Sequence, residues 1–568
     1  MNEVLDTSST PGRHPLVQQN LLDKVITYIS PKAGAKRLAS RGALALAGAF
    51  TGGRGGYGGY NGARIDRAAL RAWRPGGGSA QADISPDLPM LRDRTRDAVR
   101  NAPVATGTVA NSVSAIVGTG LACNPGINYK VLGITEDQAT EWNSDTGDRF
   151  DVWASSTDSD VAEWVDFYTN QDIALRSSFE SGDSWVLTPL VERPGRGVQL
   201  ALQLLEADRV CNPTGKQNSE TLQDGVELDP ATGKRIAIHA AKVHPGDMRL
   251  TSQTWTRVEV RGRETGRANV LQIWKPLRPG QMRGVPWLAP IIEPLKQLTR
   301  WTDNELAAAV TSSLFTLFVK MDPEAFSSLF EEDAQQAIVQ RNQKWSGEME
   351  NSKAVNLLPG EEVQTASMNR PNPEFDPFWN AMVRQIGMAV QIPVEVLTMH
   401  FQSSYSAARG ALLLAWRFYR ERRDLLAKQF CQPVYELWLE NEVAQGRISA
   451  PGFFADPYIR AAWCKATWTG DGPGSIDPQK EVSAAKDRVE MDISTLQAES
   501  LLHDGGDWET KMRQRAREVK AQKAAGTWKP PGNGGTPPAS APAEDSSSDD
   551  MPPPAPPPAR RPRQAVAA

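Results

Sequence analysis

The chain has little cysteine, and its four cysteines are not arranged as a metal or redox site. Cys123, Cys211, Cys431 and Cys464 stand far apart in the 568 residues, without the paired spacing of a zinc site or a dithiol motif. We interpret them as reduced, small apolar residues of a cytosolic protein. The cysteine content therefore predicts no bound metal.

A targeting segment and long apolar runs are also missing. The first ten residues, MNEVLDTSST, lack the basic start and apolar run of a signal peptide. The longest apolar stretches, residues 43–50 and 307–319, are too short or too interrupted by Thr and Ser to cross a bilayer. We therefore expect no membrane-spanning segment and no membrane partner.

Neither sign of charge dominates the chain. The sequence has 63 Lys and Arg against 67 Asp and Glu, which provides no global attraction to nucleic acid. The length exceeds the size at which one hydrophobic core keeps growing, so several domains or one elongated subunit is expected. Tryptophan is abundant, with 17 residues, and this side chain is favoured where large surfaces meet as well as in cores.

Signatures of catalysis are absent as well. Lys216 follows a glycine, but the first glycine of a phosphate-binding loop, five residues earlier, and the Ser or Thr after the lysine are both missing. The chain is therefore not expected to hydrolyse ATP. His239 and His244 lie in a predicted strand and loop, which disfavours a zinc pair. The run Gly182-Asp183-Ser184 lacks the second glycine of a nucleophile elbow, and we interpret it as an exposed turn between a helix and a strand. No cofactor, no catalytic residue and no enzymatic activity are predicted.

The most informative segment is residues 403–446, which predicts a long helix. Two serines can cap its start and Gly446 can end it. Apolar side chains recur at helical spacing and predict one buried stripe: Leu412, Trp416, Tyr419, Leu426 and Phe430. Pro433 removes a backbone donor, so we expect a bend there. A bent, basic, aromatic-lined helix of this length is typical of an assembly part.

The remaining pattern predicts an α+β protein. Expected helices cover residues 88–100, 103–117, 159–181, 326–344, 375–391, 477–499 and 508–523, together with one opened by a capping box at Thr135 and Gln138. Expected strands of an antiparallel sheet cover residues 185–192, 198–206, 234–242 and 254–261, and shorter strands cover 314–320 and 355–359.

The two ends of the chain differ in composition from the middle. Residues 1–74 hold eleven Lys or Arg against four Asp or Glu and include a Gly-Arg-Tyr tract at 52–60, which suits a flexible basic tether or a nucleic-acid contact. Twelve of the 41 prolines lie in the last 40 residues beside an acidic cluster, residues 544–550, so disorder is expected beyond Lys529.

Several segments carry a recognisable pattern. The most specific are residues 279–290, with the run RGVPWLAP, and residues 405–413, which begin YSAAR. The others lie at residues 91–103, 116–121, 202–209 and 225–229. In this order they resemble the portal proteins of tailed bacteriophages, specifically the lambda-type family. Residues 400–403 depart from the more usual polar loop, and residues 1–80 match no known pattern.

The resemblance implies a phage portal fold, a mostly helical elongated subunit in parts named wing, stem, clip, tunnel loop and crown. The implied boundaries are an arm at 1–85, a wing containing the antiparallel sheet at 86–286, stem helices at 287–313 and 375–391, a clip at 314–374, a tunnel loop at 392–402, a long wing helix at 403–470, a crown at 471–528 and a disordered tail at 529–568. The expected DNA-channel residues are Met399, His400, Phe401 and Gln402. Trp416, Tyr419 and Trp438 are expected to pack within the wing or the ring.

The resemblance also implies a function and a set of partners. Such a protein forms a ring of about twelve copies at one capsid vertex, through which double-stranded DNA passes without sequence recognition. The implied protein partners are further copies of the chain, the terminase large subunit, the major capsid protein, head-tail connector or neck proteins, and a scaffold or head maturation protease. The implied location is the virion, and the host cytoplasm during assembly. The alternative is an enzyme acting on DNA or glycans through an unrecognised site, which would be a monomer or dimer instead of a ring.

Overall fold

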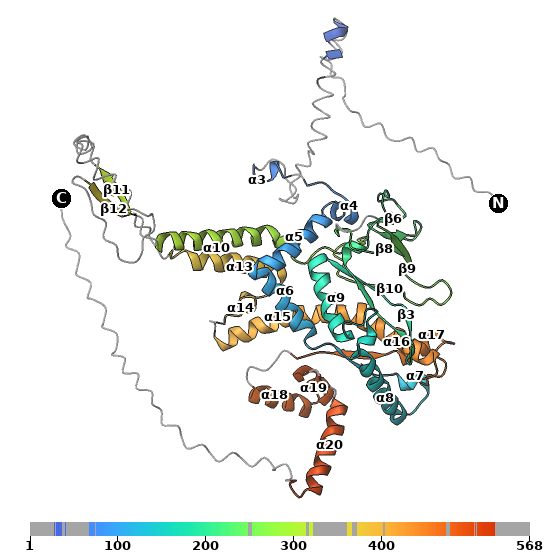
Figure 1. Ribbon diagram of the computed structural model, residues 1–568. Coiled ribbons are helices and arrows are strands. Elements are labelled where there is room, and N and C mark those ends of the chain that lie inside the picture. Colours follow the sequence, from blue (N-terminus) through green and yellow to red (C-terminus); the bar gives the residue numbers. More distant parts are fainter. Residues whose placement is uncertain are drawn as a thin grey trace, which may run out of the picture. The chain divides into compact units, whose positions relative to one another are not determined.

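The structure is a computed structural model of the full chain (Figure 1). The residues it describes are 68–73, 75–247, 253–313, 317–321, 361–365, 372–401, 404–472, 478–504, 506 and 508–528, with isolated positions between 26 and 40. The chain divides into two units, Met1–Ser79 and Ala80–Ala568. The first contains the short helix α3 (Ala68–Arg71). The expected helix at 326–344, the expected strand at 355–359 and the Pro-rich tail lie outside the described residues.

The second unit opens with helices whose ends follow the sequence. After α4 (Ala80–Ile84), α5 runs over Leu88–Asn101 and α6 over Pro103–Val117, with Pro103 in the first turn as predicted. Following α7 (Tyr129–Leu132), the capping box of Thr135 and Gln138 opens α8 (Glu136–Ala154). Helix α9 spans Phe167–Ser181, so the predicted start at 159 was wrong. The cause is Asp166, whose side chain accepts a hydrogen bond from the Thr169 backbone and caps the helix later.

The strands form several small antiparallel sheets instead of the single sheet predicted. Their orders are β10-β2-β5, β6-β7-β8-β9, the hairpin β3-β4, and the pairs β1-β13 and β11-β12. The bounds are β1 (Ala122–Pro125), β2 (Asp183–Leu187), β3 (Leu190–Arg193), β4 (Gly197–Leu200), β5 (Gln203–Leu205), β6 (Leu222–Gln223), β7 (Val226–Leu228), β8 (Arg235–Ala241), β9 (Trp255–Glu259), β10 (Val270–Trp274), β11 (Leu317–Met321), β12 (Glu361–Thr365) and β13 (Ala466–Thr469). Pro189 interrupts the expected strand 185–192, because proline cannot donate to a ladder.

Two antiparallel helices extend together from the sheets (Figure 1). Helix α10 spans Ile292–Ser313, and α13 spans Phe375–Val390 beside it. The ring of Trp301 stacks on Phe375 with centroids 4.8 Å apart, and the Asn372 amide donates to Glu305. These contacts join the two helices although 60 or more residues separate them in the sequence.

The long helix is continuous but not uniform. It consists of α15 (Tyr405–Leu426), the π-helical segment η6 (Ala427–Cys431) and α16 (Gln432–Ala444). The irregularity therefore lies in the turn before Pro433, where the wider π-helical turn makes room for the proline ring and its missing donor. Ser404 occupies the N-cap position but accepts no capping hydrogen bond, so the predicted serine cap is wrong.

After the long helix come α17 (Pro457–Trp463), α18 (Pro478–Glu490), α19 (Leu496–Asp504) and α20 (Trp508–Ala524). The expected helix at 477–499 is thus divided between α18 and α19, with Asp492 at a positive φ of 57° in the break. The short 3-10 turns are Thr157–Ser159, Ala207–Arg209 and Ala289–Ile291. Helices together with antiparallel sheets confirm the predicted α+β class.

Aromatic rings connect the long helix to α8 and α9. Phe150 of α8 meets the rings of Tyr435 and Trp438 edge to face, at centroid distances of 5.3 and 5.1 Å. Phe167 of α9 lies 5.4 Å from Phe430 in the π-helical segment. Because such rings bury large apolar areas, this cluster helps to hold the long helix against α8 and α9.

Candidate assembly and DNA-channel sites

A fully buried guanidinium organises the joint that precedes α10. Arg283 is 1% exposed, and all five of its N–H groups have acceptors. Its Nε and Nη2 donate to Asp183 at 2.7 and 3.0 Å, and the remaining donors reach the backbone carbonyls of Ala207, Val210 and Asp224 at 2.7–2.8 Å. Because all of its donors are used within the chain, this side chain has a structural role and no N–H group free for a ligand.

A second arginine completes this ionic cluster from helix α5. Arg92 donates from Nε to the Ser181 carbonyl at 2.9 Å and pairs with Asp183 and Asp208, each at 3.2 Å. Burial and the nearby Arg283 charge lower the Arg92 pKa to about 10, so it stays charged at neutral pH. Burial by itself raises the pKa of Asp183, but the charges of Arg283 and Arg92 outweigh it and bring that pKa below its ordinary value. The pKa of Asp208 is lowered for the same reasons by Arg92 and Arg96.

Two glycines meet next to this cluster with no room for side chains. A Cβ on Gly284 would lie 1.9 Å from the Gly182 carbonyl oxygen, and one on Gly182 would lie 2.3 Å from the Gly284 oxygen. Asp183 and Ser184 in the same turn are 0% and 1% exposed. The prediction of an exposed turn at 182–184 is therefore wrong: the turn is buried because Arg283 and Gly284 close over it.

The ionic cluster unites segments that the sequence keeps apart. Arg92, Asp208, Arg283 and Gly284 come from three of the segments that carried the resemblance to portal proteins. Sequence reasoning did not single these residues out, although charged residues inside otherwise specific motifs are a usable signal. The cluster fixes α5, the α9–β2 turn and the chain leading into α10 against one another, so it sets the position of the α10/α13 pair.

The predicted channel residues lie on one exposed segment that is anchored at its beginning. Ile392 is 3% exposed, and the short helix α14 (Val394–Leu397) packs against α13 and α15. Met399 is 67% and Phe401 47% exposed, His400 is exposed, and Gln402 lies outside the described residues. Met399 also has a positive φ of 54°, unusual for a residue with a side chain. The predicted loop therefore begins as a packed helical turn and is exposed only near its end.

The predicted packing residues of the long helix are not equally buried. Trp438 is 2% and Tyr419 6% exposed, whereas Trp416 is half-buried beneath Arg423, whose guanidinium lies 5.1 Å from its ring centroid. The buried face of α15 is formed by Ala411, Ala415, Phe418, Tyr419 and Leu426. At this part of the helix the buried positions are Ala411 and Ala415, each one residue before the predicted Leu412 and Trp416. The predicted buried face was therefore displaced by about one residue there.

Other sequence candidates have structural roles or none. His239 has a partner within the protein: its Nε2 lies 2.8 Å from the Glu227 carboxylate. Burial raises the pKa of the Cys123 and Cys431 thiols well above the ordinary range. Burial also raises the pKa of Cys464 to about 12, so these thiols stay protonated. Among the described residues there is no group of His, Cys, Asp and Glu able to hold a metal ion. No helix in the described part of the chain is long and apolar enough to cross a bilayer.

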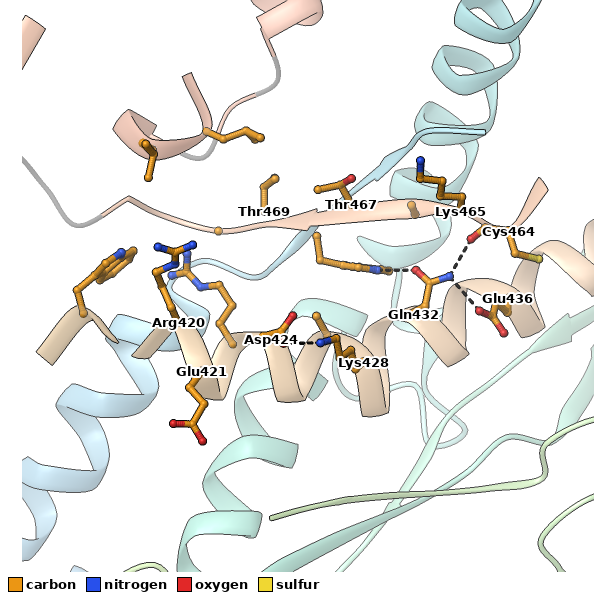
Figure 2. Close-up of a pocket in the computed structure, with 18 of the residues that line it drawn as sticks. Arg420, Glu421, Asp424, Lys428, Gln432, Glu436, Cys464, Lys465, Thr467 and Thr469 are labelled. Carbon is orange, nitrogen blue, oxygen red and sulfur yellow. Dashed lines mark hydrogen bonds and ion pairs between the residues drawn. The ribbon is translucent and has the colours of Figure 1, made fainter. Parts of the chain in front are cut away.

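A groove of about 840 Å³ lies between the long helix and strand β13 (Figure 2). Gln432 connects the two walls: its amide donates to the Cys464 carbonyl at 2.8 Å and its oxygen accepts from the Trp468 indole at 3.1 Å. Leu501 and Leu502 of α19 line the groove from the C-terminal helices. Sequence reasoning did not predict this groove, since its walls come from three separate segments.

The family model for phage portal proteins of the lambda family matches residues 66–423, more than half of the chain. The chain belongs to the lambda family of phage portal proteins. It is 23% identical over 483 residues to portal protein B of Escherichia phage lambda, covering 81% of this chain and 89% of the relative. It is 24% identical over 485 residues to the portal protein of Escherichia phage N15, covering 80% and 89%.

Among solved structures, the matches include chains from gene transfer agent particles. A chain from the neck of the native particle, computed with C12 symmetry, is 13% identical at a TM-score of 0.36, with 65% of this chain and 92% of that chain covered. A chain from the virion of the native particle is 14% identical at a TM-score of 0.36, with 66% and 93% covered.

Proposed function

We propose that this phage portal protein assembles into a closed ring of about twelve copies that forms the DNA conduit at one capsid vertex. The match to the lambda family over residues 66–423 carries the proposal. In the proposed assignment, α10 and α13 are the stem helices, residues 314–374 the clip, residues 392–402 the tunnel loop and residues 471–528 the crown. Residues 86–286 and the long helix would then form the wing.

The exposed apolar side chains of α13 and α15 support a role in assembly. Phe378 and Met388 of α13 are 47% and 77% exposed, and Leu413 and Leu414 of α15 are 54% and 58% exposed. A ring closes when one patch of a subunit binds a different patch of the next, and exposed apolar side chains on neighbouring helices suit such a contact. In the ring these faces would be covered by adjacent copies.

The charge of the chain suits a conduit. Each phosphate neutralised by Lys or Arg adds ~0.9 to the salt slope of DNA affinity, so a strongly basic lining would hold the duplex in place. Met399, His400 and Phe401 offer bulk and include no Lys or Arg, which would let DNA slide. We further propose docking of terminase and later of connector proteins at the clip, contact with the major capsid protein and with a scaffold or maturation protease, and residence in the virion after assembly in the host cytoplasm.

The decisive experiment is electron microscopy of the purified protein together with native mass spectrometry. Closed rings with a central channel are expected, with a mass near twelve times the 62.1 kDa subunit. A protein that stays monomeric or dimeric under all salt and concentration conditions would contradict the proposal.

A further inference from the structure

The groove between the long helix and β13 carries positive charge that the described residues do not neutralise. Arg420 has no carboxylate partner among them, and neither has the exposed Lys465 at the other end of the groove. Arg423 is held by the backbone carbonyls of Ala115, Ile116 and Asp471 at 2.8–3.1 Å, which leaves its charge without a direct ion pair. The nearby Asp471 carboxylate offsets part of this charge.

The acidic residues of the groove are already engaged. Glu421 points away from the strand in Figure 2 and pairs with Lys275 outside the groove. Asp424 pairs with Lys428 at 2.6 Å. Glu436, nearer Lys465, accepts from the neutral Gln432 amide at 3.0 Å and keeps its negative charge. Positive charge therefore collects at the end of the groove near Trp416, where Arg420 and Arg423 lie next to each other.

The groove also has an apolar wall, and β13, which lines it, has one edge that no described strand pairs with. In the described sheets β13 has β1 as its one strand neighbour, so its other edge has no strand paired with it. Leu501, Leu502 and the Trp416 ring provide apolar surface. An unpaired edge next to cations suits an extended, acidic polypeptide segment.

The chain itself contains such a segment. Residues 543–551, AEDSSSDDM, are the longest proline-free stretch after Lys529 and contain four carboxylates and no basic residue. Pro542 borders it on one side and Pro552, Pro553 and Pro554 on the other, and proline does not donate to a strand edge. We propose that the acidic segment 543–551 binds in the groove of its own copy, with its carboxylates against Arg420, Arg423 and Lys465.

The length of the chain permits this contact. Leu501 and Leu502 stand at the groove, and α20 begins at Trp508, a few residues later. The 17 residues of α20 carry the chain about 26 Å away. The 20 residues from 525 to 544 can span up to about 66 Å, more than enough for the return. Tethering provides an effective concentration on the order of millimolar, so a weak contact suffices for occupancy.

The docked segment would connect the C-terminal helices to the long helix. Within the groove it would lie between α19 on one side and Arg420 on the other, so it would restrict their relative movement. Because the contact is ionic and lies at the surface, it would weaken as salt screens the charges. The contact is built within one copy and does not depend on the ring proposed above.

The test places a photo-cross-linking amino acid at Ser547 of the full chain and maps the products by mass spectrometry. We expect cross-links to residues 416–428, 465–470 and 501–502, reduced about fivefold by Arg420→Glu and by 0.5 M salt. Arg417→Glu is the matched control, since Arg417 is exposed on the same helix but lines a different groove. Its cross-links should stay at the wild-type level.

Four results would overturn the inference. Cross-links that map outside the groove, that are insensitive to Arg420→Glu, or that join a 15N-labelled copy to an unlabelled one would each place the segment elsewhere. If added duplex DNA strongly protects the groove, and replacing the carboxylates of residues 544–550 by amides has no effect, the groove binds the phosphates of DNA instead of this segment. Ring formation is scored in the same samples, so failure of the proposed function is seen separately.

Discussion

Arg283 and Asp183 form a bidentate ion pair in which both side chains are closed to solvent, with N···O distances of 2.7 and 3.0 Å. They are 100 residues apart in the chain, and the pair fastens the strand β2 to the segment that enters α10. Since the guanidinium also satisfies three backbone carbonyls, removing either partner would leave several buried polar groups without a counterpart.

Replacing this carboxylate by an amide should destabilise the fold strongly. We expect Asp183→Asn to lower the free energy of unfolding by about 3–5 kcal/mol, because it leaves buried Arg283 and Arg92 charges uncompensated. Urea denaturation followed by tryptophan fluorescence measures the change. Asp145→Asn, which breaks an exposed pair with Arg149, is the control and should cost less than about 1 kcal/mol. Equal losses of unfolding free energy in the two variants would show that the ionic cluster does not stabilise the fold.

Stability should depend on pH through the same cluster. The pKa values of Asp183 and Asp208 lie below their ordinary values in the folded protein, so their stabilisation is present above about pH 4. It is lost as pH falls through the lower folded-state values, when protonation separates the carboxyls from their arginines. Urea midpoints between pH 7 and pH 3 should therefore fall at the acidic end, and Asp208→Asn should reduce that fall. A midpoint unchanged down to pH 3 would contradict it.

The contact between the two glycines predicts a large asymmetry between glycine variants. Gly284→Ala would place a methyl group 1.9 Å from the Gly182 oxygen, and the backbone must move to accept it. We expect a loss of about 3 kcal/mol or more, or insoluble protein. Gly107→Ala on helix α6 meets only the Asn111 amide at 3.9 Å and should stabilise the chain by about 0.5–1 kcal/mol. Thermal denaturation of both variants provides the comparison.

The two tryptophans of the long helix should separate folding from assembly. Trp438→Ala removes a core side chain that is 2% exposed, so we expect a loss of about 3–5 kcal/mol of stability. Trp416→Ala removes a half-buried ring under Arg423 and should leave soluble, folded protein that is mostly unassembled. Thermal denaturation measures the change in stability, and native mass spectrometry measures the fraction of protein in rings. Normal rings from Trp416→Ala with unchanged thermal stability would remove this residue from the interface.

The channel assignment predicts a defect in packaging without a defect in folding. His400 and Phe401 are exposed, so replacing both by Ala should leave ring formation and capsid incorporation near normal. Packaging or retention of DNA should be impaired, because the bulk at the narrowest part of the conduit is lost. The measurement is the DNA length per particle in the mutant phage. Full-length genomes at wild-type yield would exclude these residues from the channel, and loss of rings would place them in a subunit interface.

The sequence by itself determined the local elements that depend on neighbouring residues. Pro103 and the capping box at Thr135 and Gln138 specify helix starts through hydrogen bonds within one turn, so they were predictable. The α+β class and the family followed from periodicity and from motifs that lie within single segments. The approximate extents of α10 and α13 followed in the same way.

Only the tertiary structure decided which of these residues act together. Nothing in the spacing of Arg92, Asp183, Asp208 and Arg283 shows that they meet, because their contact depends on how α5, β2 and the segment before α10 pack. The same holds for the rotation of the buried face of α15, where Ala411 and Ala415 face the core because of what packs on them. The groove beside β13 is likewise made by three distant segments. Side-chain environments of this kind are set by long-range packing, which a local pattern does not encode.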